Sequence, residues 1–148
     1  MARLHPLGAA LAVSLLAAVA CAQNPYSQAR RLYSRLGLSG ALATYMPAAQ
    51  QSDSDGEFYV GTMYVFEAAA AKSRANNWPR AKEMEDAALH WFKRSQRHGN
   101  QKAKRLLDIV SANDTSVLYV SIQYIMNGTK PPPESSFPSK TTPTGSRR

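Results

Sequence analysis

The chain has 148 residues, enough for one domain, and carries 18 Lys and Arg against 10 Asp and Glu, a formal net charge of +8. Its single cysteine excludes an intrachain disulfide and the zinc or iron–sulfur sites that need four cysteines. Beyond the N-terminus no apolar stretch is long enough to cross a bilayer, so the sequence excludes a polytopic membrane protein.

Residues 1–22 have the order of a secretory signal: Arg3, then an apolar run over 7–20, then small residues. Two ways of processing remain open. Ala20-Cys21-Ala22 fits an A-x-A cleavage site, after which the mature chain begins at Gln23. Alternatively, 18–21 resembles a bacterial lipobox, in which Cys21 would carry the lipid anchor. Both predict export, either to the periplasm or as a lipoprotein anchored in the outer membrane.

Residues 23–128 are predicted to form one mostly helical domain. The apolar residues of 26–36, Leu36 included, are spaced for one helix face, and a short helix is expected at 41–45. Ser54-Asp55-Gly56-Glu57 fits a capping box, in which Ser54 caps a helix that continues to about Ala75.

The clearest helix begins near Pro79 and ends before Gly99. Its apolar stripe has steps of three and four: Ala81, Met84, Ala88, Trp91, Phe92 and Ser95. Glu83 and Glu85 are interpreted as charges of its early turns, where they complement the helix dipole.

A further helix is expected over 103–110, but 117–126 is ambiguous, because its β-branched and aromatic residues also favour a strand. The predicted fold is therefore all-α, an antiparallel stack of helix hairpins. The alternative is α+β, with 58–66 and 117–126 as paired strands. Residues 129–148 hold five of the nine prolines and are expected to be a disordered, basic tail.

Two segments, 58–66 and 118–126, resemble each other and suggest stacked helical units. The residues around them resemble the Sel-one-like repeat, a relative of the tetratricopeptide repeat. The match to its signature rests on Gly61, Tyr64, Ala88, Trp91, Phe92, Gly99 and Ala103. The chain departs from the family pattern in lacking the G-x-G turn, and Asp108 and Ser111 replace the Gly and Tyr of the next unit. The resemblance implies a short α/α stack that acts as an adaptor or scaffold.

No arrangement typical of catalysis is found in the sequence. His90 and His98 have no cysteine beside them, Asp86 and His90 are spaced as a surface pair, and no phosphate loop or nucleophile motif is present. We therefore expect a non-catalytic protein without a metal or cofactor, and we expect the rings of Trp91 and Phe92 in the core.

One cluster of cations, here called the basic corner, stands out between 93 and 105, where no acidic residue interrupts it. It consists of Lys93, Arg94, Arg97, Lys102, Lys104 and Arg105. The last three fall in the first turns of a helix, where the dipole disfavours cations by about 0.3 kcal/mol or more each. The hypothesis is that this corner docks another envelope protein of acidic character. An anionic membrane or wall polymer is the alternative partner, and nucleic acid is not expected in an exported protein.

Overall fold

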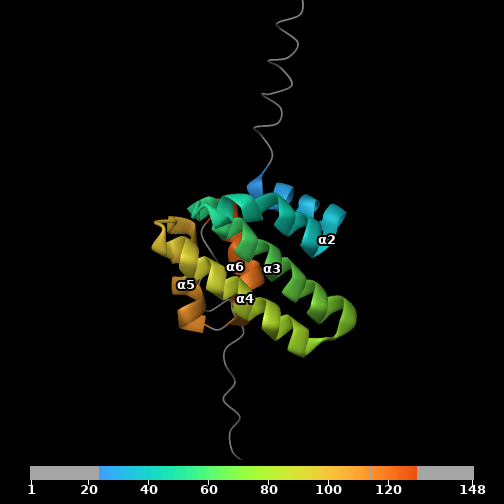
Figure 1. The fold of residues 1–148 in the computed structure, drawn as a ribbon. Helices are drawn as coiled ribbons and strands as arrows, with labels where there is room; N and C mark the ends of the chain where they lie inside the picture. Colours follow the sequence, from blue (N-terminus) through green and yellow to red (C-terminus); the bar gives the residue numbers. More distant parts are fainter. Residues whose placement is uncertain (1–23, 114, 130–148) are drawn as a thin grey trace, which may run out of the picture.

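The computed structural model describes residues 24–113 and 115–129, without the side chains of 112 and 113. Every regular element in these residues is a helix (Figure 1). The elements are α2 (Pro25–Gln50), α3 (Ser54–Ala75), α4 (Trp78–Arg97), α5 (Gln101–Asn113), the 3-10 turn η1 (Thr115–Val117) and α6 (Leu118–Met126). The all-α prediction is confirmed and the α+β alternative is wrong, because 58–66 lies within α3 and 117–126 is helical. Cys21, the signal and the tail beyond Thr129 lie outside the described residues.

Helices that follow one another in the sequence pack against one another in space. Figure 1 shows α3 and α4 as a long antiparallel hairpin, with α2 across the α3 side. Helix α5 packs on α4, and α6 returns to contact α5, α3 and α2. The result is a small stack of hairpins in which α3 and α4 form the central pair.

Helix α2 is longer than the sequence predicts, because it joins the two expected helices across a kink. Gly37 has φ 66° and ψ −173°, a backbone conformation that glycine adopts at little cost. Pro47 lies inside the helix, which nevertheless continues to Gln50. Leu36 was expected on the buried face but is 49% exposed. It precedes the kink and faces Gly40, where an added Cβ would lie 2.7 Å from the Leu36 Cβ.

The start of α3 corrects the predicted capping box. Asp53, not Ser54, is the N-cap, and its carboxylate accepts a hydrogen bond from the Asp55 amide at 3.0 Å. Glu57 therefore does not act as the box partner; its side chain is fully buried instead. One turn in, Gly56 permits a close approach to α2, because a Cβ there would lie 2.8 Å from the Ala48 Cβ.

The centre of the core is the contact between Gly61 of α3 and Phe92 of α4. A Cβ on Gly61 would lie 2.6 Å from Cε1 of Phe92, so only glycine lets the ring lie this close. The Phe92 ring is fully buried, and its centroid lies 5.4 Å from that of Phe58. Ala88 of α4 and Ala103 of α5 are fully buried as well.

The prediction that both rings of the central helix are buried is right for Phe92 and wrong for Trp91. The buried line of α4 is Ala81, Met84, Ala88, Phe92 and Ser95. Trp91 is one residue, about 100°, away from Phe92 around the helix, so it lies at the edge of this line and is only partly buried. Its ring is covered by a cation, since the Arg94 guanidinium carbon lies 5.3 Å from the ring centroid.

Candidate functional site

The basic corner is built on the tight turn between α4 and α5. Gly99 adopts φ 91°, and its amide bonds to the Gln96 carbonyl, so α4 ends and α5 begins two residues later. Five members of the corner are exposed to solvent: Lys93 and Arg97 on α4, and Lys102, Lys104 and Arg105 on α5. None of these five forms an ion pair with another residue of the described ranges.

Arg94 is the exception, because its guanidinium group bonds to other residues of the protein and is not free on the surface of the basic corner. Its Nε donates to Oε1 of the buried Glu57 at 2.5 Å, and its Nη2 donates to the Ala49 carbonyl at 3.3 Å. Arg94 thereby ties α4 to α3 and to the end of α2. We correct its assignment accordingly: Arg94 holds the helices under the basic corner together and is not one of the exposed cations.

Glu57 is the centre of this support. Its Oε2 accepts from Nδ1 of His98 at 2.8 Å, so both carboxylate oxygens are bonded to residues at the end of α4. The carboxylate also lies in the first turns of α3, where the helix dipole favours negative charge. A fully buried carboxylate needs such partners, because burial of an unpaired charge costs several kcal/mol.

Asn100 fixes the turn on the α3 side. Its Oδ1 accepts from the amides of Lys102 and Ala103, at 2.9 and 3.1 Å, and so caps α5. Its Nδ2 donates to the Ser54 carbonyl at 3.2 Å and to Oδ1 of Asp55 at 2.9 Å. Ser95 adds a bond from Oγ to the same Ser54 carbonyl at 2.6 Å. The exposed cations therefore project from a turn that side-chain hydrogen bonds hold in place.

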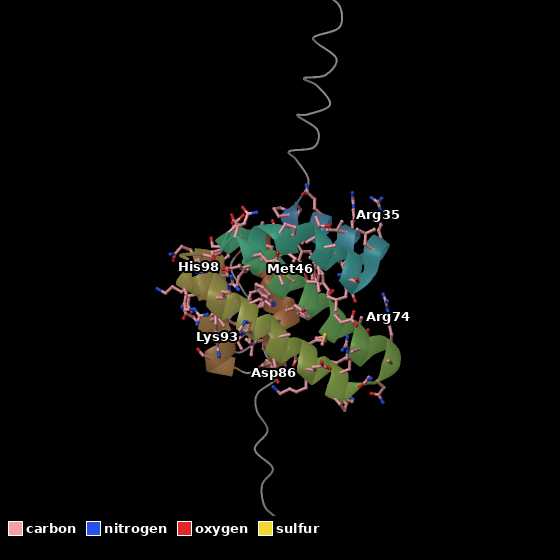
Figure 2. The ribbon with its side chains drawn as sticks, viewed as in Figure 1. Arg35, Met46, Arg74, Asp86, Lys93 and His98 are labelled. Carbon is pink, nitrogen blue, oxygen red and sulfur yellow. The ribbon has the colours of Figure 1, made fainter. Side chains whose placement is uncertain are left out.

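An apolar groove lies beside the basic corner, between α4 and α5. It is a shallow hollow of about 370 Å³, with Leu89 and Val110 among its apolar walls. Lys93 and Asp108 supply charge at this hollow. Figure 2 shows Lys93 and His98 on the same side of the molecule. The sequence did not predict this groove, although Leu107, expected in the core, is one of its half-buried lining residues.

The acidic residues of α4 divide into surface and buried groups. Glu83 is exposed and pairs with Arg80 at 3.3 Å, whereas Glu85 is buried and pairs with Lys72 of α3. Glu85 was expected as a charge of the early turns that complements the helix dipole, but it lies beyond the first turn and is buried against Lys72. Asp86 pairs with Lys82 at 2.5 Å, so its predicted partnership with His90 is wrong too.

The other residues that the sequence analysis assigned to a repeat signature have structural roles. Gly61 and Ala88 allow close helix packing, Gly99 ends α4, and Tyr64 is half-buried. No group of three or more metal-ligating side chains occurs in the part of the chain that the structure describes. Within the same ranges, no helix has the length and apolarity needed to cross a bilayer. No family model matches the chain, and neither does any curated protein or solved structure.

Proposed function

We propose that this protein is a non-catalytic, exported interaction module of the bacterial cell envelope, related to Sel-one-like repeats. Its partner is an amphipathic, acidic segment of another envelope protein. The helix-hairpin stack supplies the rigid support, and the basic corner supplies the recognition.

The observation that carries this proposal is the pairing of cations with an apolar groove. The exposed cations lie at the α4–α5 turn, and the groove of Leu89, Leu107 and Val110 runs between the same two helices. A partner helix with apolar residues on one face and carboxylates at its edge complements both features. A purely polyanionic wall polymer would use the cations but leave the groove empty.

The energetics agree with a binding role. Lys102 and Lys104 lie in the first turns of α5, near the positive end of the helix dipole, and neither forms an ion pair with a described residue. Each position is disfavoured by about 0.3 kcal/mol or more at low salt. An acidic partner would remove this cost, and the positive charges of the basic corner would accelerate its association.

The test is capture from a solubilised envelope fraction with the full exported protein as bait, followed by mass spectrometry. The corner variant reverses three charges: Lys102→Glu, Lys104→Glu and Arg105→Glu. The matched control reverses three exposed arginines elsewhere: Arg31→Glu, Arg35→Glu and Arg74→Glu. We expect the wild type and the control to capture the same acidic protein, and the corner variant to lose it. Equal capture by all three baits would overturn the proposal.

A Leu107→Lys variant distinguishes a protein segment from a polymer. Leu107 is half-buried in the groove, so the added charge blocks apolar docking without removing a cation. Loss of the captured protein would support docking in the groove. Unchanged capture would show that binding depends on charge alone and would contradict a helical partner.

A further inference from the structure

Four arginines gather on the opposite side of the molecule from the basic corner. Arg30, Arg31 and Arg35 belong to α2, Arg74 belongs to the last turn of α3, and all four are exposed. We call this set the arginine face. Figure 2 shows Arg35 and Arg74 at one edge of the molecule, with Lys93 and His98 at the other.

The spacing on α2 places these side chains together. Ser27, Arg30, Arg31 and Ser34 follow at steps of three, one and three, which is one face of a helix. They line a shallow hollow of about 350 Å³ with Arg35. A second hollow, of about 120 Å³, shares Arg30 and Ser34 and adds Ser73 and Arg74. Short serines between long arginines leave a surface that a flat partner can approach.

Three of the four arginines, Arg30, Arg35 and Arg74, form no ion pair with a described carboxylate. Arg30 Nη1 donates to the phenol oxygens of Tyr119 at 2.6 Å and Tyr26 at 3.4 Å. Burial raises the pKa of Tyr26 to about 12, so that phenol stays neutral at physiological pH. Arg35 and Arg74 form no ion pair within 24–113 and 115–129.

Glu67, which lies in α3 seven residues before Arg74, already has partners. It is only partly exposed and accepts from the Tyr33 hydroxyl at 2.6 Å. The Arg80 Nη2 lies 3.9 Å from its other oxygen. Burial, followed by the bond to Glu67, raises the pKa of Tyr33 as well. The face therefore presents guanidinium groups among hydroxyl groups.

We propose that the arginine face binds the phosphate groups of anionic phospholipids at a membrane surface. Guanidinium groups pair with phosphate through two parallel hydrogen bonds, and the open hollows accept headgroups from one plane. The shortness of the segment between Cys21 and α2 favours a membrane surface over a soluble ligand. Helix α2 begins at Pro25, four residues after Cys21, and four residues span at most about 14 Å. An acyl anchor at Cys21, one of the two processing alternatives, would hold α2 beside the bilayer.

This site extends the proposed function without depending on it. With the arginine face on the membrane, the basic corner and its groove lie on the other side of the molecule and stay open to a protein partner. Loss of either site leaves the other testable.

The experiment is co-sedimentation of the full exported protein with vesicles. One set is phosphatidylcholine alone, and in the other about a third of the lipid is phosphatidylglycerol. Comparison of the two sets cancels any contribution from an acyl chain. The face variant replaces three arginines by glutamine: R31Q, R35Q and R74Q. The charge-matched control is K102Q, K104Q and R105Q, and circular dichroism checks that both fold.

Each cation near an anionic surface contributes about five-fold to partitioning, so the face variant should lose on the order of 100-fold. The control should retain most of the binding, and the wild-type binding should weaken as salt rises. If the face variant does not fold, R35Q alone should lose about five-fold, because Arg35 is exposed and in no described ion pair.

Three results would overturn the proposal. One is an equal loss in the face variant and the control, which would mean a response to net charge. Another is the absence of any preference for phosphatidylglycerol. The third is displacement from vesicles by millimolar glycerol phosphate, which would show a small-anion pocket in place of a membrane surface.

Discussion

Removal of the charge of Glu57 should destabilise the fold more than any surface change. In Glu57→Gln one of the two oxygens that accept from Arg94 and His98 is replaced by an NH2 group, which cannot accept, and the negative charge is lost. Breaking a buried ion pair from one side typically costs 3–5 kcal/mol. Arg94 keeps 30% of its side-chain exposure and can be hydrated, so we expect about 2–4 kcal/mol.

The assay is chemical and thermal unfolding followed by circular dichroism. For a domain of this size about 1 kcal/mol corresponds to roughly 4 °C, so Tm should fall by about 8–16 °C. The matched control is Glu83→Gln, which removes an exposed carboxylate from a surface pair and should change stability by less than about 0.5 kcal/mol. A Glu57→Gln protein as stable as Glu83→Gln would refute the assignment of Glu57 and Arg94 as the support of the corner.

Three further perturbations have distinct expected outcomes. Phe92→Ala empties the space against Gly61 and should cost about 3–5 kcal/mol in denaturant unfolding; a cost below 1 kcal/mol would place the ring outside the core. Asn100→Ala removes the α5 cap and should cost about 1–2 kcal/mol, measured in the same way, whereas no change would show that the turn does not need its cap. The pKa of Tyr26 is raised from 10.0 to about 12, so its stabilising contribution is complete below pH 10 and is lost as pH rises towards 12. Unfolding free energies measured across this range should fall less steeply in Tyr26→Phe, and identical slopes would contradict the burial of the phenol.

The sequence predicted the helices whose apolar residues follow one clean period. The stripe of α4 was identified almost completely, because Ala81, Met84, Ala88 and Phe92 lie on one line. Trp91 was misplaced because an aromatic residue next to that line fits the same pattern, and periodicity alone does not distinguish the line from its edge.

The buried charges could not be predicted from local spacing. Glu57 and Arg94 are 37 residues apart, and only the packing of α3 on α4 brings them together. The burial of Glu85 could not be predicted for the same reason, since its partner Lys72 lies in the preceding helix. The ambiguity at 117–126 had a different cause, because the strand propensity of these residues is high. In the structure they are helical and pack against α5 and α3, contacts that the local sequence does not reveal.

The arginine face was missed although its signal was present. Arg30, Arg31 and Arg35 share one helical face with Ser27 and Ser34, a spacing that the sequence displays. The contribution of Arg74 needed the structure, because it comes from the far end of α3.

The claim that the protein is an interaction module is tested most directly by crosslinking in the native envelope. A photoreactive residue at Gln96, exposed beside the α4–α5 groove, should crosslink to one acidic protein. The same residue at Glu83, exposed near the other end of α4, is the control and should yield no such adduct. Adducts of equal identity and yield at both positions, or none at Gln96, would contradict the account.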